Sequence, residues 1–404
     1  MEVLFVSTSC SRRKYKEVFE MRNRKLIDPQ QKFCNLLIEG MSMSDDVHIT
    51  CMSALPVSAS TVSQRTFSKE DEEISNTLSY TYLPFVNGKI LRYLSLFLNA
   101  YYYAKQWVKK YPDKDKVIVC DVLSYYITRP VQIVARKFGI KVIGIVTDLP
   151  LLSTNMKNRK ESLLKKIGLS VFQHLTDKSI YDYDAYIPLT ESIDGVVNPN
   201  GKPSLIIEGS VDYREQANTE SVKKKKVVLY AGGAYEKYGL KNLVEAFIKA
   251  ETRNYELHIY GEGSYVDELC AIEKQYPYIK YLGMASLDDI VRHEKEATLL
   301  VNPRPSDEEF SKYSFPSKTL EYMVSGTPLL TTKLPGIPDE YFQYVYHFDG
   351  EDINSMALKI AEVLEKSMPE LCHYGEIARL FALQRKSNIA QGNRIVRFVL
   401  NECK

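Results

Sequence analysis

The sequence predicts an α/β protein made of two Rossmann-like domains, whose parallel sheets face each other across an inter-domain cleft. Three observations support this prediction. The chain has 404 residues, and a single hydrophobic core stops growing near about 250 to 300 residues. Short apolar runs alternate with helical stretches along the whole chain, as in parallel sheets covered by helices. Residues 195–226 are rich in Gly, Pro, Asn and charge, which is typical of a domain boundary. One wide sheet is the alternative.

The first predicted domain covers residues 1–205. Its candidate strands are continuously apolar, as expected of strands that are buried on both faces. They are residues 3–8, 47–53, 80–84, 116–122, 141–148 and 185–190.

The second predicted domain covers residues 206–380 and repeats this alternation. Its candidate strands are residues 226–233, 256–263, 279–283, 297–303, 327–332 and 344–348. Between the first two, Leu243, Ala246, Phe247 and Ala250 have the spacing of one helical face. Residues 381–404 are predicted to form a C-terminal helix that packs back on the first domain.

Composition excludes several classes of protein. Apolar residues make up 45% of the chain and charged residues 26%, which is ordinary for a globular protein. No apolar run is long enough to span a membrane, and the start, MEVLFVSTSC, lacks the basic segment of a signal peptide, so we expect a cytoplasmic protein. The seven cysteines form no Cys-x-x-Cys pair and the six histidines have no ligand spacing, so no metal site is expected.

Positive charge is concentrated in the first half of the chain. Residues 1–210 hold 28 Lys and Arg against 22 Asp and Glu. Basic runs at residues 11–16, 22–25 and 157–166 could attract an anionic partner, namely nucleic acid, phospholipid or a phosphate-bearing substrate, and each could equally be a solvated surface. They are too dispersed to favour nucleic acid.

The stretch YSFPSKTLEYMVSGTPLLTT, residues 313–332, gives the strongest functional signal. Pro316 and Ser317 mark a helix start and Gly326 its end. The N–H groups at such a start, placed at the carboxyl edge of a sheet, form an anion site. Lys318 and Arg304 would add positive charge, so the site suits a diphosphate.

Two further features have both a functional and a structural interpretation. Glu321 lies one turn after Lys318, where its carboxylate could accept hydrogen bonds from ribose hydroxyls or simply pair with Lys318. Gly232 and Gly233 follow the strand that ends near Tyr230, where they could admit a phosphate or merely allow a tight turn.

These residues carry a family resemblance. FPSKTLEYMVSGTPLLTTKLPGIPDE resembles the donor-binding segment of retaining nucleotide-sugar glycosyltransferases of family 4, which have the two-domain GT-B fold. YAGGAYEKYGLKNLVEAF, LHIYGEGSYVDEL, YLGMASLDDIVRHEKEATLLVNP and DGEDINSMALKIAEVL agree with it in order, over residues 226–365.

The resemblance implies roles for particular residues. Glu321 matches the second acid of the family's paired-glutamate motif, which holds the ribose, and Tyr313 stands where the first acid contacts the donor sugar. Gly233 stands at the place of a family arginine, and Lys237 or Tyr238 lies near that of a lysine. The remaining implied contacts are diphosphate neutralisation by Lys237, Arg304 and Lys318, backbone contacts from Ser317 to Thr319, and a base site near Gly283 and Met284.

The first half offers fewer candidates. Asp148, in GIVTDLP, resembles the place of an acceptor-side acid or histidine, and it could instead cap the next helix. Residues 155–175 have an amphipathic, basic pattern that suits either packing or peripheral contact with the inner membrane surface.

Together these features predict a metal-independent, retaining glycosyltransferase of cell-surface polysaccharide synthesis. The resemblance implies a nucleoside-diphosphate sugar donor, a UDP-sugar in preference to a GDP-sugar, a glycan or lipid-linked acceptor, and no cofactor. The alternatives are a catalytically silent GT-B subunit that binds or stabilises a partner glycosyltransferase, and a nucleotide-sugar epimerase of the same fold. A dehydrogenase is disfavoured, because neither half has a Gly-x-Gly-x-x-Gly turn after its first strand.

Overall fold

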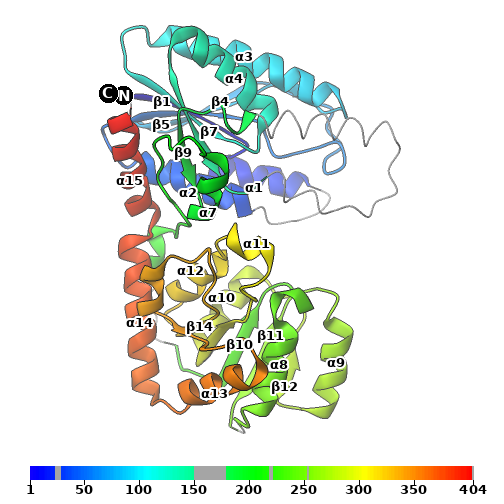
Figure 1. Ribbon diagram of the computed structural model, residues 1–404. Helices are drawn as coiled ribbons and strands as arrows, with labels where there is room; N and C mark the ends of the chain where they lie inside the picture. Colours follow the sequence, from blue (N-terminus) through cyan, green and yellow to red (C-terminus); the bar gives the residue numbers. More distant parts are fainter. Residues whose placement is uncertain (23–28, 150–178, 218–221, 253, 403–404) are drawn as a thin grey trace. The chain divides into compact units, whose positions relative to one another are not determined.

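The protein divides into two compact units (Figure 1). Unit 1 is Met1–Ser210 with Asn388–Lys404, and unit 2 is Val211–Ser387. The computed structural model describes residues 1–22, 29–149, 179–217, 222–252 and 254–402. Each unit has its own sheet, so the alternative of one wide sheet is wrong and the predicted α/β class with two parallel sheets is confirmed.

Unit 1 is built on a seven-stranded sheet in the order β4-β5-β2-β1-β7-β8-β9. All neighbouring strands pair in parallel except β4 with β5, which are antiparallel. A short antiparallel pair, β3 with β6, lies apart from this sheet. The strands are β1 (Glu2–Ser7), β2 (His48–Ser53), β3 (Thr66–Phe67), β4 (Glu70–Ser75), β5 (Leu78–Tyr82), β6 (Phe85–Val86), β7 (Lys116–Asp121), β8 (Lys141–Val146) and β9 (Ala185–Pro188).

The strand β4 was not expected from the sequence. Its residues, EDEEIS, are mostly acidic and therefore lack the apolar character of a buried strand. The strand forms because it lies at the sheet edge, where Arg13 pairs with Glu70 and Glu72 and Lys14 pairs with Glu70. Charged edge strands also discourage edge-to-edge association.

Six helices are described in unit 1, and the sequence explains their ends. Ser11 caps the first of them by accepting a hydrogen bond from the Lys14 N–H at 3.0 Å. Gly139 ends another in the left-handed region, at φ 65°. The helices are α1 (Arg12–Met21), α2 (Pro29–Met41), α3 (Leu91–Lys110), α4 (Tyr125–Phe138), α7 (Glu191–Val197) and α15 (Asn388–Glu402).

Unit 2 is built on a six-stranded, fully parallel sheet in the order β12-β11-β10-β13-β14-β15. Each strand falls inside a range that the sequence predicted. The strands are β10 (Val227–Ala231), β11 (Glu256–Tyr260), β12 (Ile279–Tyr281), β13 (Leu299–Asn302), β14 (Leu329–Thr331) and β15 (Tyr346–His347).

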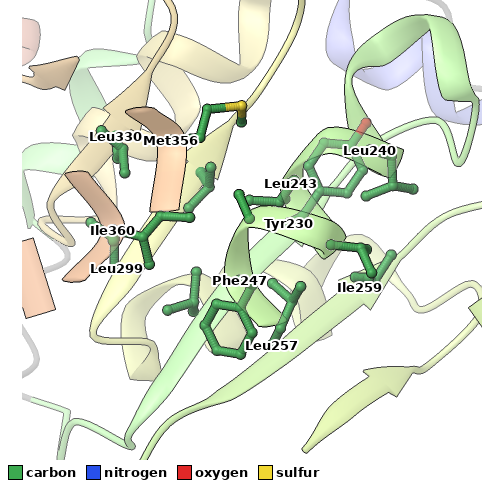
Figure 2. Packing of buried hydrophobic residues seen from close by; sticks show 14 of the residues in the cluster. Tyr230, Leu240, Leu243, Phe247, Leu257, Ile259, Leu299, Leu330, Met356 and Ile360 are labelled. Carbon is green, nitrogen blue, oxygen red and sulfur yellow. The ribbon is translucent and has the colours of Figure 1, made fainter. Parts of the chain in front are cut away.

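The core of unit 2 lies between this sheet and its covering helices (Figure 2). Leu243, Ala246 and Phe247 are buried there as their spacing predicts, and burying a side chain such as Phe247 contributes about 1.5 to 3 kcal/mol. The helical elements are η1 (Tyr213–Ala217), η2 (Glu236–Tyr238), α8 (Leu240–Lys249), α9 (Val266–Gln275), α10 (Leu287–Glu296), α11 (Glu309–Lys312), α12 (Ser317–Val324), η3 (Asp339–Gln343), α13 (Ile353–Leu364) and α14 (Met368–Arg385).

The C-terminal segment is shared between the units. Residues 381–402 comprise the end of α14, in unit 2, and α15, which packs on α2 in unit 1. The amphipathic segment of residues 155–175 lies outside the described residues. In the described part of the chain, no helix has the length and apolarity needed to cross a membrane.

Candidate functional site

Two loops of unit 2 meet at the carboxyl ends of neighbouring parallel strands. One follows β10 and contains Gly232 and Gly233, and the other follows β13 and leads to α12. The loops touch, because the ring of Tyr238 lies 6.0 Å from that of Phe310. Ligands of parallel α/β sheets typically bind at this edge.

The glycines of the first loop allow close packing inside unit 2. The Gly232 N–H donates to the Tyr260 carbonyl at 3.1 Å. Gly261 has φ 131°, and a Cβ there would lie 1.7 Å from the Gly232 carbonyl oxygen. A Cβ at Gly233 would lie 2.9 Å from the rings of Tyr235 and Tyr238. These contacts support the structural interpretation of the glycines and fix the path of the loop.

Arg304 and Lys237 share one aromatic ring. The Arg304 guanidinium lies 5.4 Å from the centroid of Tyr238, and the Lys237 ammonium lies 5.3 Å from it. Arg304 also lies 5.3 Å from the ring of Phe310 and donates to the Ser314 hydroxyl at 3.2 Å. The predicted cations of the two loops are therefore brought together.

Neither of these cations is neutralised by the described residues. Within those residues, no carboxylate lies in ion-pair distance of Lys237 or Arg304. Burial lowers the pKa of Arg304, although a guanidinium stays charged in proteins. The result is two positive charges beside one ring, an arrangement that favours an anion with several oxygens.

Lys318 has a different environment. Its ammonium lies 3.1 Å from a carboxylate oxygen of Glu321 and 3.7 Å from one of Glu294. Burial by itself would lower the pKa of Lys318, but the two carboxylates outweigh it and raise that pKa. The charge of Lys318 is thus largely compensated, and the ion pair proposed as the structural alternative for Glu321 is present.

Glu294 was not expected at the site from the sequence. It lies on α10 and is 2% exposed. Nothing in its sequence neighbourhood distinguishes it from the other acids of an amphipathic helix, so its approach to Lys318 follows from the packing of α10 near α12.

The start of α12 offers free backbone donors. Pro316 is the N-cap and supplies no side-chain cap. The Thr319 N–H donates to the Pro316 carbonyl at 2.8 Å, whereas those of Ser317 and Lys318 have no hydrogen-bond partner in the described chain. Ser317 is exposed and Thr319 is buried. An exposed helix start of this kind can accept an anion.

Tyr322 fixes α12 against the sheet, which the sequence did not indicate. Its hydroxyl accepts from the Ala231 N–H at 2.9 Å and donates to the Ala231 carbonyl at 3.1 Å. Each such bond contributes about 1 kcal/mol. These two bonds therefore fix the position of α12, which carries Lys318, relative to the end of β10.

The remaining predicted residues are spread over both units. Gly283 has φ 67°, its carbonyl accepts from the Gly261 N–H at 2.9 Å, and Met284 is 66% exposed. Tyr313 ends α11 and is half-buried. Asp148 belongs to unit 1, where its carboxylate accepts from the Leu149 N–H at 2.8 Å. Burial raises the pKa of Asp148, opposed by that bond.

A separate polar hollow of about 220 Å³ lies in unit 1. Its lining includes Gln132, Arg136, Asp182 and Lys202. It adjoins the starts of β8 and β9, at the amino edge of the sheet, and so differs in position from the carboxyl-edge sites that are typical of this fold class.

One family model matches most of unit 2. Residues 212–380 match the family model "Glycosyl transferases group 1". A search of curated proteins yields no matching sequence.

Solved structures of similar fold cover almost the whole chain. Sucrose-phosphate synthase from Thermosynechococcus elongatus has 12% identity and a TM-score of 0.60, over 99% of each chain. Anabaena HepE in complex with UDP has 12% identity and a TM-score of 0.56, over 99% of this chain and 100% of that one. A UDP-forming trehalose-phosphate synthase from Burkholderia xenovorans has 10% identity and a TM-score of 0.61, over 99% and 100%. The chain therefore has the GT-B fold, and residues 212–380 of its second unit are similar to group 1 glycosyltransferases.

Proposed function

We propose that the protein transfers a sugar from a UDP-sugar to a glycan or lipid-linked acceptor of cell-surface polysaccharide synthesis, with retention of the anomeric configuration and without a metal ion. The observation that carries this proposal is the pair of uncompensated cations, Lys237 and Arg304, at the ring of Tyr238. The match to the group 1 glycosyltransferase model supports glycosyl transfer. Two similar structures support UDP, since one is a complex with UDP and the other is a UDP-forming synthase.

The chemistry follows from where charge develops. When the bond between the sugar and the diphosphate breaks, negative charge grows on the departing phosphate. Preorganised cations and helix N–H groups stabilise that charge most strongly at that moment, which is the main source of electrostatic catalysis. Lys237, Arg304 and the free N–H groups of Ser317 and Lys318 would supply this stabilisation, with Lys318 contributing less because of its two carboxylates.

The other predicted residues keep narrower roles in the proposal. Glu321 would accept hydrogen bonds from the ribose, the backbone near Gly283 and Met284 would contact the base, and Asp148 would lie on the acceptor side. A catalytically silent subunit is the second candidate, favoured by Tyr313, which stands where the resemblance expects an acid.

The first test is UDP binding measured by isothermal titration calorimetry. Arg304→Ala and Lys237→Ala are each expected to weaken UDP binding at least tenfold, because each removes one charge-assisted contact of about 1.5 to 3 kcal/mol. Lys249→Ala, at an exposed position on α8, is the matched control and should bind UDP as the parent does. Unchanged binding in both site variants would contradict the assignment.

The second test separates the enzyme from the silent subunit. The purified protein is incubated with a panel of UDP-sugars, with and without acceptor glycans, and UDP release is measured. Release that depends on Arg304 supports transfer or donor hydrolysis. UDP binding without release from any donor would favour the silent subunit, and conversion of the donor to another sugar would favour the epimerase.

A further inference from the structure

Helix α3 of unit 1 has two apolar faces, and its own unit covers one of them. Leu96, Ala100, Ala104 and Trp107 are buried, at helical spacing, and α3 packs on α4 (Figure 1). A second set, Leu91, Leu94, Leu98 and Tyr102, recurs at i, i+3, i+7 and i+11 and is exposed. A soluble surface helix has a polar outer face, so the second stripe needs an explanation.

The exposed stripe is large for isolated surface residues. Leu91 is 56% exposed, Leu94 54%, Leu98 59% and Tyr102 53%. Ile90, directly before the helix, is 79% exposed and extends the stripe. Single exposed apolar side chains are normal, whereas a contiguous set marks an interaction site. We name these five residues the α3 stripe.

Basic residues continue the α3 stripe. Lys105 and Lys109 follow Tyr102 by three and seven positions and therefore lie on the same helical face, while Lys89 precedes the helix. No carboxylate of the described chain pairs with any of these three lysines. Residues 76–112 contain no Asp or Glu at all.

The neighbouring helix is basic as well. Helices α3 and α4 together carry seven Lys and Arg and no Asp or Glu. Two of them, Arg129 and Arg136, pair with Asp182. Helices α3 and α4 themselves therefore carry an excess of positive charge, which favours an anionic partner. An acid from another element, Asp71 of β4, interacts with Lys110 at the end of α3, outside the three lysines named above.

We propose that the α3 stripe docks on an anionic lipid surface, with helix α3 lying in the plane of the membrane interface. The leucines would enter the boundary between headgroups and acyl chains, and Tyr102 would lie at headgroup level. Lys89, Lys105 and Lys109 would extend their ammonium groups to lipid phosphates while their methylene chains cover apolar surface.

Charge argues against a second copy of the chain as the occupant. A symmetric contact would place the stripe against an identical, equally basic face, and like charges would then oppose each other. An anionic bilayer satisfies both the apolar residues and the cations. The proposal is independent of the transfer reaction, since it concerns a surface of unit 1 and not the residues around Tyr238.

Vesicle co-sedimentation of the full chain tests the proposal. Two vesicle types are compared, phosphatidylcholine alone and phosphatidylcholine with roughly one-third phosphatidylglycerol, a charge density comparable to an anionic leaflet. The parent protein is expected to bind the anionic vesicles at least tenfold more strongly than the neutral ones. Added salt should weaken this binding, because it screens the lysines.

Two variants and one control examine the surface itself. Leu94→Glu with Leu98→Glu should reduce binding to anionic vesicles at least tenfold, and Lys105→Glu with Lys109→Glu should do so as well. Leu358→Glu, at a 73% exposed leucine on α13 of unit 2, should leave binding unchanged. Because all five positions are on the surface, the melting temperatures should stay close to that of the parent.

Three outcomes would overturn the proposal. One is equal binding of the parent and the Leu94→Glu, Leu98→Glu variant to anionic vesicles, with both folded. Another is equal binding of the parent to neutral and anionic vesicles. The third combines two results: the parent does not bind vesicles, and it forms a dimer that the Leu94→Glu, Leu98→Glu variant converts to a monomer. That result would assign the α3 stripe to self-association. UDP binding should be the same in all the α3 variants, so failure here is distinguishable from failure of the proposed function.

Discussion

At the scale of single residues, the site separates into charges that are compensated and charges that are not. Lys318 faces Glu321 and Glu294, whereas Arg304 and Lys237 face aromatic rings. A phosphate approaching Lys318 must compete with two carboxylates, and one approaching Arg304 competes with none in the described chain. From the sequence, all three cations are assigned the same role, neutralisation of the diphosphate. The sequence shows which loops carry them but not which carboxylates the fold places beside them.

Glu321 has two interpretations that binding can separate. If Glu321 holds the ribose, the parent should bind UDP at least tenfold more tightly than 2′,3′-dideoxy-UDP. The analogue lacks the two hydroxyls and would leave the Glu321 carboxylate without those hydrogen bonds. The Glu321→Ala variant should bind the two nucleotides equally. Competition calorimetry measures both affinities.

Glu294→Gln provides the control for this experiment. It removes the other carboxylate near Lys318 while keeping the side chain's size, so the preference for UDP over the dideoxy analogue should persist. If Glu321→Ala keeps that preference too, Glu321 serves only as the ion-pair partner of Lys318.

At the scale of elements, close backbone contacts set the shape of the loop after β10. Gly261 combines φ 131° with an approach that leaves 1.7 Å between a built Cβ and the Gly232 carbonyl oxygen. The loop can follow this path only if the residue directly after β11 has no side chain, as Gly261 has none. The sequence shows the glycine, but the pairing of β10 with β11 is needed to show what it contacts.

Gly261→Ala is therefore expected to destabilise unit 2 by at least about 2 kcal/mol, since a non-glycine residue in such a backbone region costs of order 1 to 3 kcal/mol before any clash. Urea unfolding measures the change. Gly195→Ala, inside α7 with open space around it, should be neutral or slightly stabilising, by about 0.5 to 1 kcal/mol. Equal effects of the two substitutions would contradict this account.

At the scale of the whole molecule, the C-terminal residues complete unit 1 although they follow unit 2 in sequence. Helix α15 packs on α2, and the Gln391 amide donates to the Gly209 carbonyl at 2.9 Å. A Cβ at Gly40 would lie 1.8 Å from the Asn388 carbonyl oxygen, so the two backbones are in direct contact. Unit 2 has its own core and needs none of these contacts.

Truncation after Ser387 should consequently destabilise unit 1 and leave unit 2 folded. Calorimetry of the parent is expected to show two transitions, of which only the one belonging to unit 1 shifts or disappears on truncation. Limited proteolysis with mass spectrometry identifies the unit that has become sensitive. Gly40→Val should produce the same selective effect, and loss of unit 2 in either variant would argue against the division.

The sequence by itself determined the α/β class, the positions of the twelve strands expected in the two parallel sheets, and the start of α12 after Pro316. These features follow from local patterns, namely continuous apolar runs, helical spacing and the punctuation by Pro and Gly. The sequence did not reveal the acidic strand β4, because the cations that pair with its acids, Arg13 and Lys14, belong to another element. Only the tertiary structure decided which cations of the candidate site remain uncompensated and which face of α3 remains uncovered, because both depend on neighbours that lie far away in the chain.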